Sequence, residues 1–237
     1  MNTKTSSPDN LDSLKDNKVI NMVDSAQLEE IKDNTRNPGL DFRLDEISSI
    51  SINKSAVERR CSNYGTRRSI KKDKQAAWLL KAISLMDLTT LSGDDTEARV
   101  KRLCSKAKQP ISTNLEKALG VESLNLSVAA VCVYHDMLSA AKNAIRDTQI
   151  NLAAVSTGFP AGLSPLPIRI QEIEYSIDSG ANEIDIVISR RHVLEGNWEA
   201  LYEEVKTFRE KCGDAHMKTI LATGELGNLT NIAKASQ

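Results

Sequence analysis

Strand-like and helix-like segments alternate five times from about residue 82 to the end of the chain, and this alternation constrains the fold more than any other feature. Each strand-like run is short and largely apolar, and a segment with apolar residues at helical spacing follows it. The five runs are Ala82–Leu88, Val128–Tyr134, Leu152–Ser156, Glu183–Ser189 and Met217–Thr223. Because strands that are apolar on both sides suit a parallel sheet covered by helices, the series predicts an α/β protein.

Two architectures fit five such units, an open doubly wound sheet and a (β/α)8 TIM barrel. A nucleotide-binding open sheet typically carries a glycine-rich turn after its first strand, but residues 91–95 (LSGDD) contain neither GxGxxG nor a P-loop. The barrel is therefore favoured. A whole barrel needs about 250 residues, so we expect residues 76–237 to form a partial TIM barrel with only about the first five βα units.

Two further segments precede this region. Residues 1–43 are polar and show little periodicity, which predicts a disordered tail. Residues 44–75 are predicted to be a helical, basic extension, with eight Lys or Arg between Lys54 and Lys74 against Glu58 and Asp73. This stretch lacks interleaved aromatic residues, so a solvated helix face and linker is favoured over an RNA contact, and a nucleic-acid partner is not expected.

The overall composition is that of an ordinary globular protein, with 40% apolar and 27% charged residues and a formal net charge of -1. No apolar run reaches the roughly 18 residues of a membrane span, and the N-terminus does not resemble a signal peptide. The four cysteines form no CxxC pair. Cys132 and His135 have CxxH spacing without a second ligand pair, so a metal site is not expected. We therefore expect a cytoplasmic protein with reduced thiols and no membrane partner.

The fourth predicted strand contains the most informative residues. Side chains alternate between the two faces of a strand, so Asp185 lies opposite the neighbouring isoleucines of Glu183–Ile188. Since isoleucines suit the helix-covered face, Asp185 should point into the barrel. Lys218 on the fifth strand can point the same way. Such a pair is either a buried salt bridge or part of an active site, and inward charges near barrel strand ends favour the active site.

Five motifs, taken in order and spacing, resemble the deoxyribose-phosphate aldolase family, and the animal-type enzymes most of all. They are Leu85–Leu91, Ala129–Tyr134, Gly158–Gly162, Glu183–Ile188 and Lys218–Leu226. The resemblance implies a class I aldolase on a TIM barrel, with neither cofactor nor metal. Its members cleave 2-deoxy-D-ribose 5-phosphate to D-glyceraldehyde 3-phosphate and acetaldehyde, in deoxyribose phosphate catabolism. The implied small-molecule partner is thus a phosphosugar.

The resemblance also implies roles for individual residues. In this family a lysine amine forms a Schiff base with the substrate, and an aspartate on the fourth strand, here Asp185, donates and accepts protons. Lys218, Asp87, Thr89 and Cys132 are secondary candidates for the same pocket. Lys218 lies on the wrong strand to replace the nucleophile.

The family takes its nucleophilic lysine from the sixth strand and its phosphate-binding loops from still later in the chain, and the present sequence stops after five predicted strands. We therefore expect a C-terminally truncated, inactive aldolase chain. The alternative is a non-catalytic short form that associates with other subunits, including copies of itself. A weaker alternative is a different phosphosugar enzyme with a TIM barrel.

Overall fold

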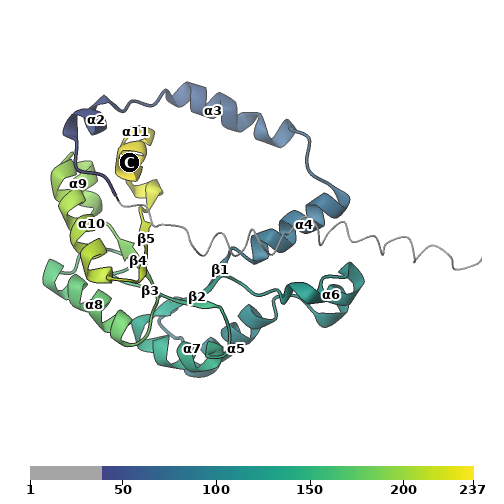
Figure 1. Ribbon diagram of the computed structural model, residues 1–237. Helices are drawn as coiled ribbons and strands as arrows, with labels where there is room; N and C mark the ends of the chain where they lie inside the picture. Colours follow the sequence, from purple (N-terminus) through teal and green to yellow (C-terminus); the bar gives the residue numbers. More distant parts are fainter. Residues whose placement is uncertain (1–38) are drawn as a thin grey trace, which may run out of the picture.

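The computed structural model describes residues 39–237, and its centre is a five-stranded sheet (Figure 1). The predicted disordered tail falls almost wholly on residues 1–38, which lie outside the described residues. All neighbouring strands are parallel, in the order β1-β2-β3-β4-β5. The strands are β1 (Asp87–Thr89), β2 (Ala130–Tyr134), β3 (Asn151–Val155), β4 (Glu183–Val187) and β5 (His216–Ile220). The prediction of an α/β protein with a parallel sheet is confirmed.

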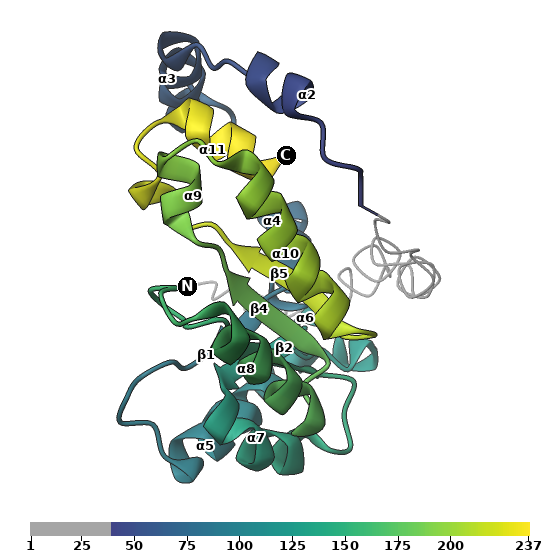
Figure 2. The ribbon, with the colours of Figure 1, turned by 90° about the vertical axis from the view of Figure 1, so that its left-hand side faces the viewer.

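The helices that connect the strands lie on the outer, convex face of the sheet (Figures 1 and 2). They are α5 (Glu97–Lys108), α7 (Leu138–Ile145), α8 (Leu166–Asp178) and α10 (Trp198–Cys212). The connections also contain α6 (Thr113–Leu119) and α9 (Arg190–Leu194), and α11 (Leu229–Ser236) follows β5. Short 3-10 turns are η4 (Tyr64–Thr66), η5 (Glu122–Leu124), η6 (His135–Met137) and η7 (Thr223–Glu225). None of the helices described for residues 39–237 is both long and apolar enough to cross a membrane.

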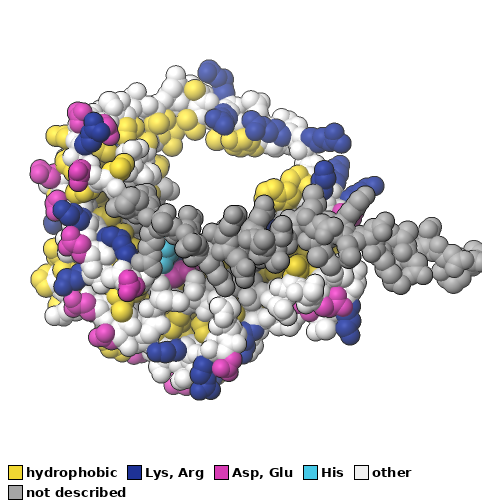
Figure 3. All heavy atoms as spheres, in the orientation of Figure 1, with side chains coloured by type: hydrophobic (Ala, Val, Ile, Leu, Met, Phe, Trp, Pro, Cys, Tyr) yellow, Lys and Arg dark blue, Asp and Glu magenta, His cyan; other side chains and the backbone are white. Residues whose placement is uncertain are grey.

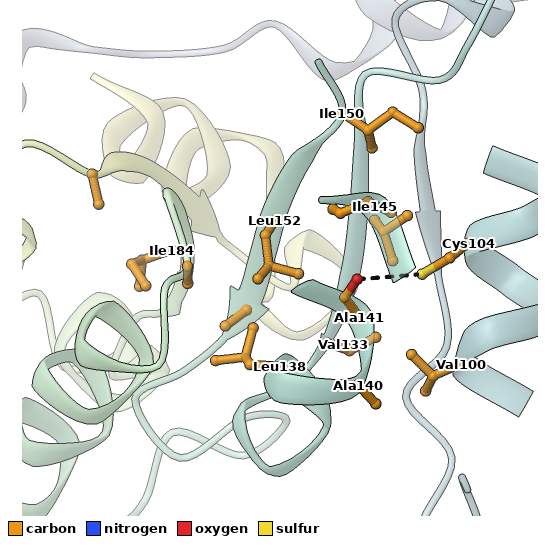
Figure 4. Packing of buried hydrophobic residues seen from close by; sticks show 14 of the residues in the cluster. Val100, Cys104, Val133, Leu138, Ala140, Ala141, Ile145, Ile150, Leu152 and Ile184 are labelled. Carbon is orange, nitrogen blue, oxygen red and sulfur yellow. Dashed lines mark hydrogen bonds between the residues drawn. The ribbon is translucent and has the colours of Figure 1, made fainter. Parts of the chain in front are cut away.

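The main hydrophobic core lies between the sheet and these helices. Val133, Leu152 and Ile184 project from three neighbouring strands toward Leu138 and other apolar helix residues (Figure 4). Ile184 and Ile186 are fully buried there, as expected for the helix-covered side of β4. The opposite, concave face carries a smaller cluster of buried residues, with Tyr134 and Phe159 packed against it. Its cluster consists of Ala130, Cys132, Ala153 and Val155.

The first strand is shorter than predicted, and it begins later. Residues 82–83 belong to α4 (Lys72–Ile83), and only Asp87–Thr89 pair with β2. Burial explains the difference, because Leu80 and Ile83 lie one helical turn apart and pack together against Val121. A short apolar run does not distinguish a strand from a buried helix segment by its periodicity.

Helical spacing predicts that Leu166, Ile170, Ile173 and Ile177 form the buried stripe of α8, and the structure differs from this prediction at one position. Ile173 is fully buried, but Leu166 is 43% exposed in the first turn of the helix. Arg169 is buried in its place, only 2% exposed. The first turn of α8 therefore meets polar backbone at the ends of the strands rather than apolar core.

The basic extension forms a chain of three helices that stands apart from the sheet. These helices are α2 (Leu44–Ser49), α3 (Lys54–Ser62) and the start of α4, whose last turns lie beyond residue 75 and bury Leu80. Every residue from 53 to 75 is exposed, and Figure 3 shows an opening between this chain of helices and the rest of the molecule. Just before the extension, the chain touches α10, where the Tyr202 hydroxyl donates to the Leu40 carbonyl (2.9 Å) and the Phe42 ring lies 5.4 Å from the Tyr202 ring.

Candidate active site

One lysine and three carboxylates gather on the concave face of the sheet. Lys218 Nζ on β5 lies 3.0 Å from Glu183 Oε2 and 3.1 Å from Asp185 Oδ1, both on β4. It also forms an ion pair and a hydrogen bond with Asp87 Oδ2 on β1. The predicted inward pair of Asp185 and Lys218 is therefore present in the structure, within a larger cluster.

Strand register accounts for the pairing of β4 with β5. Asp185 is the direct partner of Lys218 in the parallel ladder, and residues in register on one face lie side by side. The contact of Lys218 with Asp87 has a different origin. The two residues come from the first and last strands of the sheet. Their side chains can meet only because the sheet curves round upon itself, as it does in a barrel.

The Cys132 thiol completes the cluster on β2. Its Sγ donates a hydrogen bond to Asp185 Oδ2 over 3.4 Å. Asp185 thus has the thiol at one oxygen and the ammonium group at the other. The side chain of Asp185 is 15% exposed and that of Lys218 is 33% exposed, so both groups remain partly accessible to solvent.

Burial and charge change the protonation equilibria of these groups. Burial raises the pKa of Asp185, and the positive charge of Lys218 only partly opposes that rise. Burial, reinforced by the negative charge of Asp185, raises the pKa of the Cys132 thiol to about 12. For Lys218 burial acts to lower the pKa, but hydrogen bonds to Asp87 and Glu183 outweigh it and the pKa is raised. Lys218 is therefore a fixed cation at neutral pH.

The candidate residues do not all join the cluster. Asp185, Lys218, Asp87 and Cys132 do, whereas the Thr89 hydroxyl lies 3.4 Å from the Asp87 backbone oxygen and bonds to none of their side chains. Glu183 belongs to the cluster but was not among the candidates. Its side chain is only 12% exposed and also accepts a hydrogen bond from Asn151 Nδ2 (2.6 Å). The side-chain alternation along the strand that predicts an inward Asp185 also predicts an inward Glu183, so the sequence pattern could have identified Glu183.

The cluster is suited to proton transfer. A carboxyl group with a raised pKa, held between a cation and a thiol, can both accept and donate a proton. Lys218 compensates the negative charge while its own proton stays in place. Residues 39–237 contain no group of His, Cys, Asp and Glu side chains arranged to hold a metal ion.

Fold and site together are those of a TIM-barrel-like α/β protein with a charged cluster inside the curved sheet. A family model described as DeoC/LacD family aldolase matches residues 81–237. The chain is 53% identical to the deoxyribose-phosphate aldolase of Mus musculus over 200 residues and 52% identical to that of Homo sapiens over 202 residues. Each match covers 84% of this chain, but only 63% of the mouse protein and 64% of the human protein.

A comparison of structures agrees on the fold. The crystal structure of a Coccidioides immitis protein assigned as a deoxyribose-phosphate aldolase superposes with a TM-score of 0.57 at 22% identity, covering 82% of this chain and 67% of that one. The expected barrel family is thereby confirmed. The chain belongs to the DeoC/LacD family of aldolases.

Proposed function

We propose that this chain takes part in the cleavage of 2-deoxy-D-ribose 5-phosphate to D-glyceraldehyde 3-phosphate and acetaldehyde. The observation that carries the proposal is the position of Asp185, inside the curved sheet with a raised pKa, in a chain 53% identical to a deoxyribose-phosphate aldolase. Breaking the carbon–carbon bond requires a base that removes the proton of the substrate's 3-hydroxyl group. Asp185 is the group suited to that transfer.

Lys218 acts in this proposal as a charge partner and not as the nucleophile. A Schiff-base lysine must lose its proton before it attacks a carbonyl, and this requires a lowered pKa. The contacts of Lys218 with Asp87, Glu183 and Asp185 act in the opposite direction. We expect the amine that forms the Schiff base to come, as in the family it resembles, from a strand that follows the fifth.

Borohydride trapping tests the role of Lys218. The purified chain is incubated with deoxyribose 5-phosphate and sodium borohydride, which reduces a Schiff base to a stable amine, and the lysines are then mapped by mass spectrometry. We expect no adduct on Lys218. An adduct at that position would identify it as the nucleophile and overturn the proposed division of roles.

Complementation tests the role of Asp185. The chain is mixed with a polypeptide that covers the part of the mouse relative outside the matched region, and acetaldehyde release is measured. We expect activity only in the mixture, and a loss of at least about 100-fold with Asp185→Asn. The exposed variant Glu174→Gln serves as the control. Equal rates for Asp185→Asn and the control would rule out the proton-transfer role.

A non-catalytic role through association is the second candidate. It is favoured by the edges of the sheet, because within residues 39–237 β1 pairs only with β2 and β5 only with β4. Unpaired strand edges bind other strands readily. Sedimentation over a range of concentrations distinguishes the two: this role requires self-association, or binding to the mouse relative, without any acetaldehyde release in the complementation assay.

A further inference from the structure

A second charged cluster lies buried at the carboxyl ends of β3 and β4. Arg169 on α8 is 2% exposed and Glu204 on α10 is 8% exposed, and their side chains form an ion pair with Nη1 2.8 Å from Oε2. Ser189, just after β4, donates both its amide (2.7 Å) and its hydroxyl (2.6 Å) to Glu204. Every member of the cluster therefore has hydrogen-bond partners.

Besides Glu204, the guanidinium group donates to the Ser189 hydroxyl from Nη1 (2.9 Å) and to two backbone carbonyls. Nε donates to the Thr157 carbonyl over 2.9 Å, and Nη2 donates to the Val187 carbonyl over 2.6 Å. Thr157 follows β3, and Val187 is the last residue of β4. Arg169 thus joins the ends of two neighbouring strands to each other and to two helices.

Thr157 strengthens this connection. Its hydroxyl donates to the Val187 carbonyl (3.0 Å) and accepts from the Val187 amide (2.6 Å). Its backbone has φ of 59°, a left-handed conformation that a β-branched residue rarely adopts. Conformations of this kind persist only where the surroundings fix them, and they concentrate near functional sites.

The strand end fixed in this way belongs to the strand that carries Asp185. Val187 lies two residues after Asp185 on the same face of β4, and the Ser156 amide donates to the Asp185 carbonyl over 3.0 Å. A change in the bonds at Val187 would change where Asp185 stands relative to Cys132 and Lys218. Distances of about 3 Å between such groups are sensitive to small displacements of a strand.

Stability alone does not explain a buried arginine at this position. Replacing a buried ion pair by well-packed apolar residues is often neutral or stabilising, so the pair is weak support for a purely structural role. The sequence pattern of α8 would accommodate an apolar residue here. An arginine, in contrast, supplies a rigid fork of donors that reaches two strand ends at once.

We propose that Arg169, with Glu204 as its counter-charge, is a positioning residue that fixes the end of β4 and thereby the distance between Asp185 and its partners. This inference deepens the proposed function and rests on Asp185 being its proton-transfer group. Arg169 itself touches neither the Asp185 carboxylate nor Lys218. Its effect passes through the backbone of β4.

Two double variants distinguish the positioning of the end of β4 from an ion pair that only joins α8 to α10. Arg169→Met with Glu204→Leu removes the bonds to both carbonyls while keeping apolar bulk. The matched control is Lys211→Met with Glu174→Leu, which removes an exposed ion pair (3.0 Å) between the same helices, α10 and α8. If the first variant does not fold, Arg169→Lys is used instead, because lysine keeps the charge but cannot reach both the Thr157 and Val187 carbonyls.

The Cys132 thiol serves as the reporter. It faces Asp185 on β4, Lys218 on β5 and Asp87 on β1, and its pKa depends on burial and on the charge of Asp185. The rate of iodoacetamide labelling is followed at pH 9 by peptide mapping. The buried thiols Cys104 and Cys212 are followed in the same samples, since both lie in the helix-covered core.

We expect labelling of Cys132 to accelerate at least about threefold in the Arg169 variant, because displacement of Asp185 lowers the thiol pKa. Cys104 and Cys212 should label at unchanged rates, and the control variant should match the original protein. Equal acceleration of all three thiols, or no change at Cys132, would show that the cluster is merely structural. The readout requires no turnover, so failure of the proposed function leaves this test intact.

Discussion

The burial of the Asp185 carboxylate lowers the stability of the folded protein. Its folded-state pKa is raised, so the folded protein is most stable while this carboxyl group is protonated, and that contribution is lost as the pH rises above about 4. We therefore expect Asp185→Asn to increase the free energy of unfolding by about 1 kcal/mol at pH 7. The difference should shrink toward pH 3, as urea unfolding at both values would measure. A variant less stable than the original protein at pH 7 would contradict this reasoning.

Lys218 should behave in the opposite way. Its raised pKa means that its stabilisation is fully present below about pH 10.5 and is lost as the pH rises through the folded-state pKa. Lys218→Met leaves Asp87, Glu183 and Asp185 without a counter-charge, and we expect a loss of about 2 kcal/mol at pH 7. The loss should diminish as the pH falls and Asp185, whose pKa is raised, takes up a proton. Lys101→Met, which breaks an exposed pair with Glu97, is the control and should cost less than about 0.5 kcal/mol.

At the scale of helices, capping residues distinguish the elements that hold the fold together from those that do not. Asn197 caps α10 by accepting from the Ala200 amide (3.2 Å), and α10 buries Leu201 and Phe208. Asn53 caps α3 in the same way through Ala56, but α3 buries no residue. We expect Asn197→Ala to lower the free energy of unfolding by about 1 kcal/mol and Asn53→Ala to leave it unchanged. Equal losses in urea unfolding would mean that α3 unfolds together with the sheet.

Local sequence patterns could predict contacts between adjacent strands, but not contacts that depend on the arrangement of the whole sheet. Period-two alternation in Glu183–Ile188 was enough to predict an inward Asp185 beside Lys218, because both lie on adjacent strands in register. The Asp87 contact depends on how far the whole sheet curves, and no local pattern encodes that. Helical spacing likewise predicted a buried Leu166 at the start of α8, whereas the strand ends there expose carbonyl oxygens that only a donor such as Arg169 satisfies.

At the scale of the whole molecule, the structure divides the chain into a packed part and an exposed extension. Residues 76–237 contain all the strands and the hydrophobic core of the described protein, whereas every residue from 53 to 75 is exposed. The domain boundary near residue 75 remains a prediction, because burial indicates where packing starts but does not measure cooperative unfolding. Proteolysis provides that measurement, since cleavage requires local opening of the backbone.

Limited digestion with trypsin should therefore cut the extension first. Residues 54–74 contain eight Lys or Arg on a segment with no buried side chain. Helix α5 offers an internal comparison, because Lys101, Arg102 and Lys106 are also exposed but the helix packs Val100 and Cys104 into the core. We expect cuts after residues 59–71 at least about tenfold faster than cuts in α5, since each kilocalorie of protection slows opening about fivefold. The fragment that begins near residue 72 should retain a cooperative thermal transition. Comparable rates in both segments, or loss of that transition after the first cuts, would show that the extension is part of the folded unit.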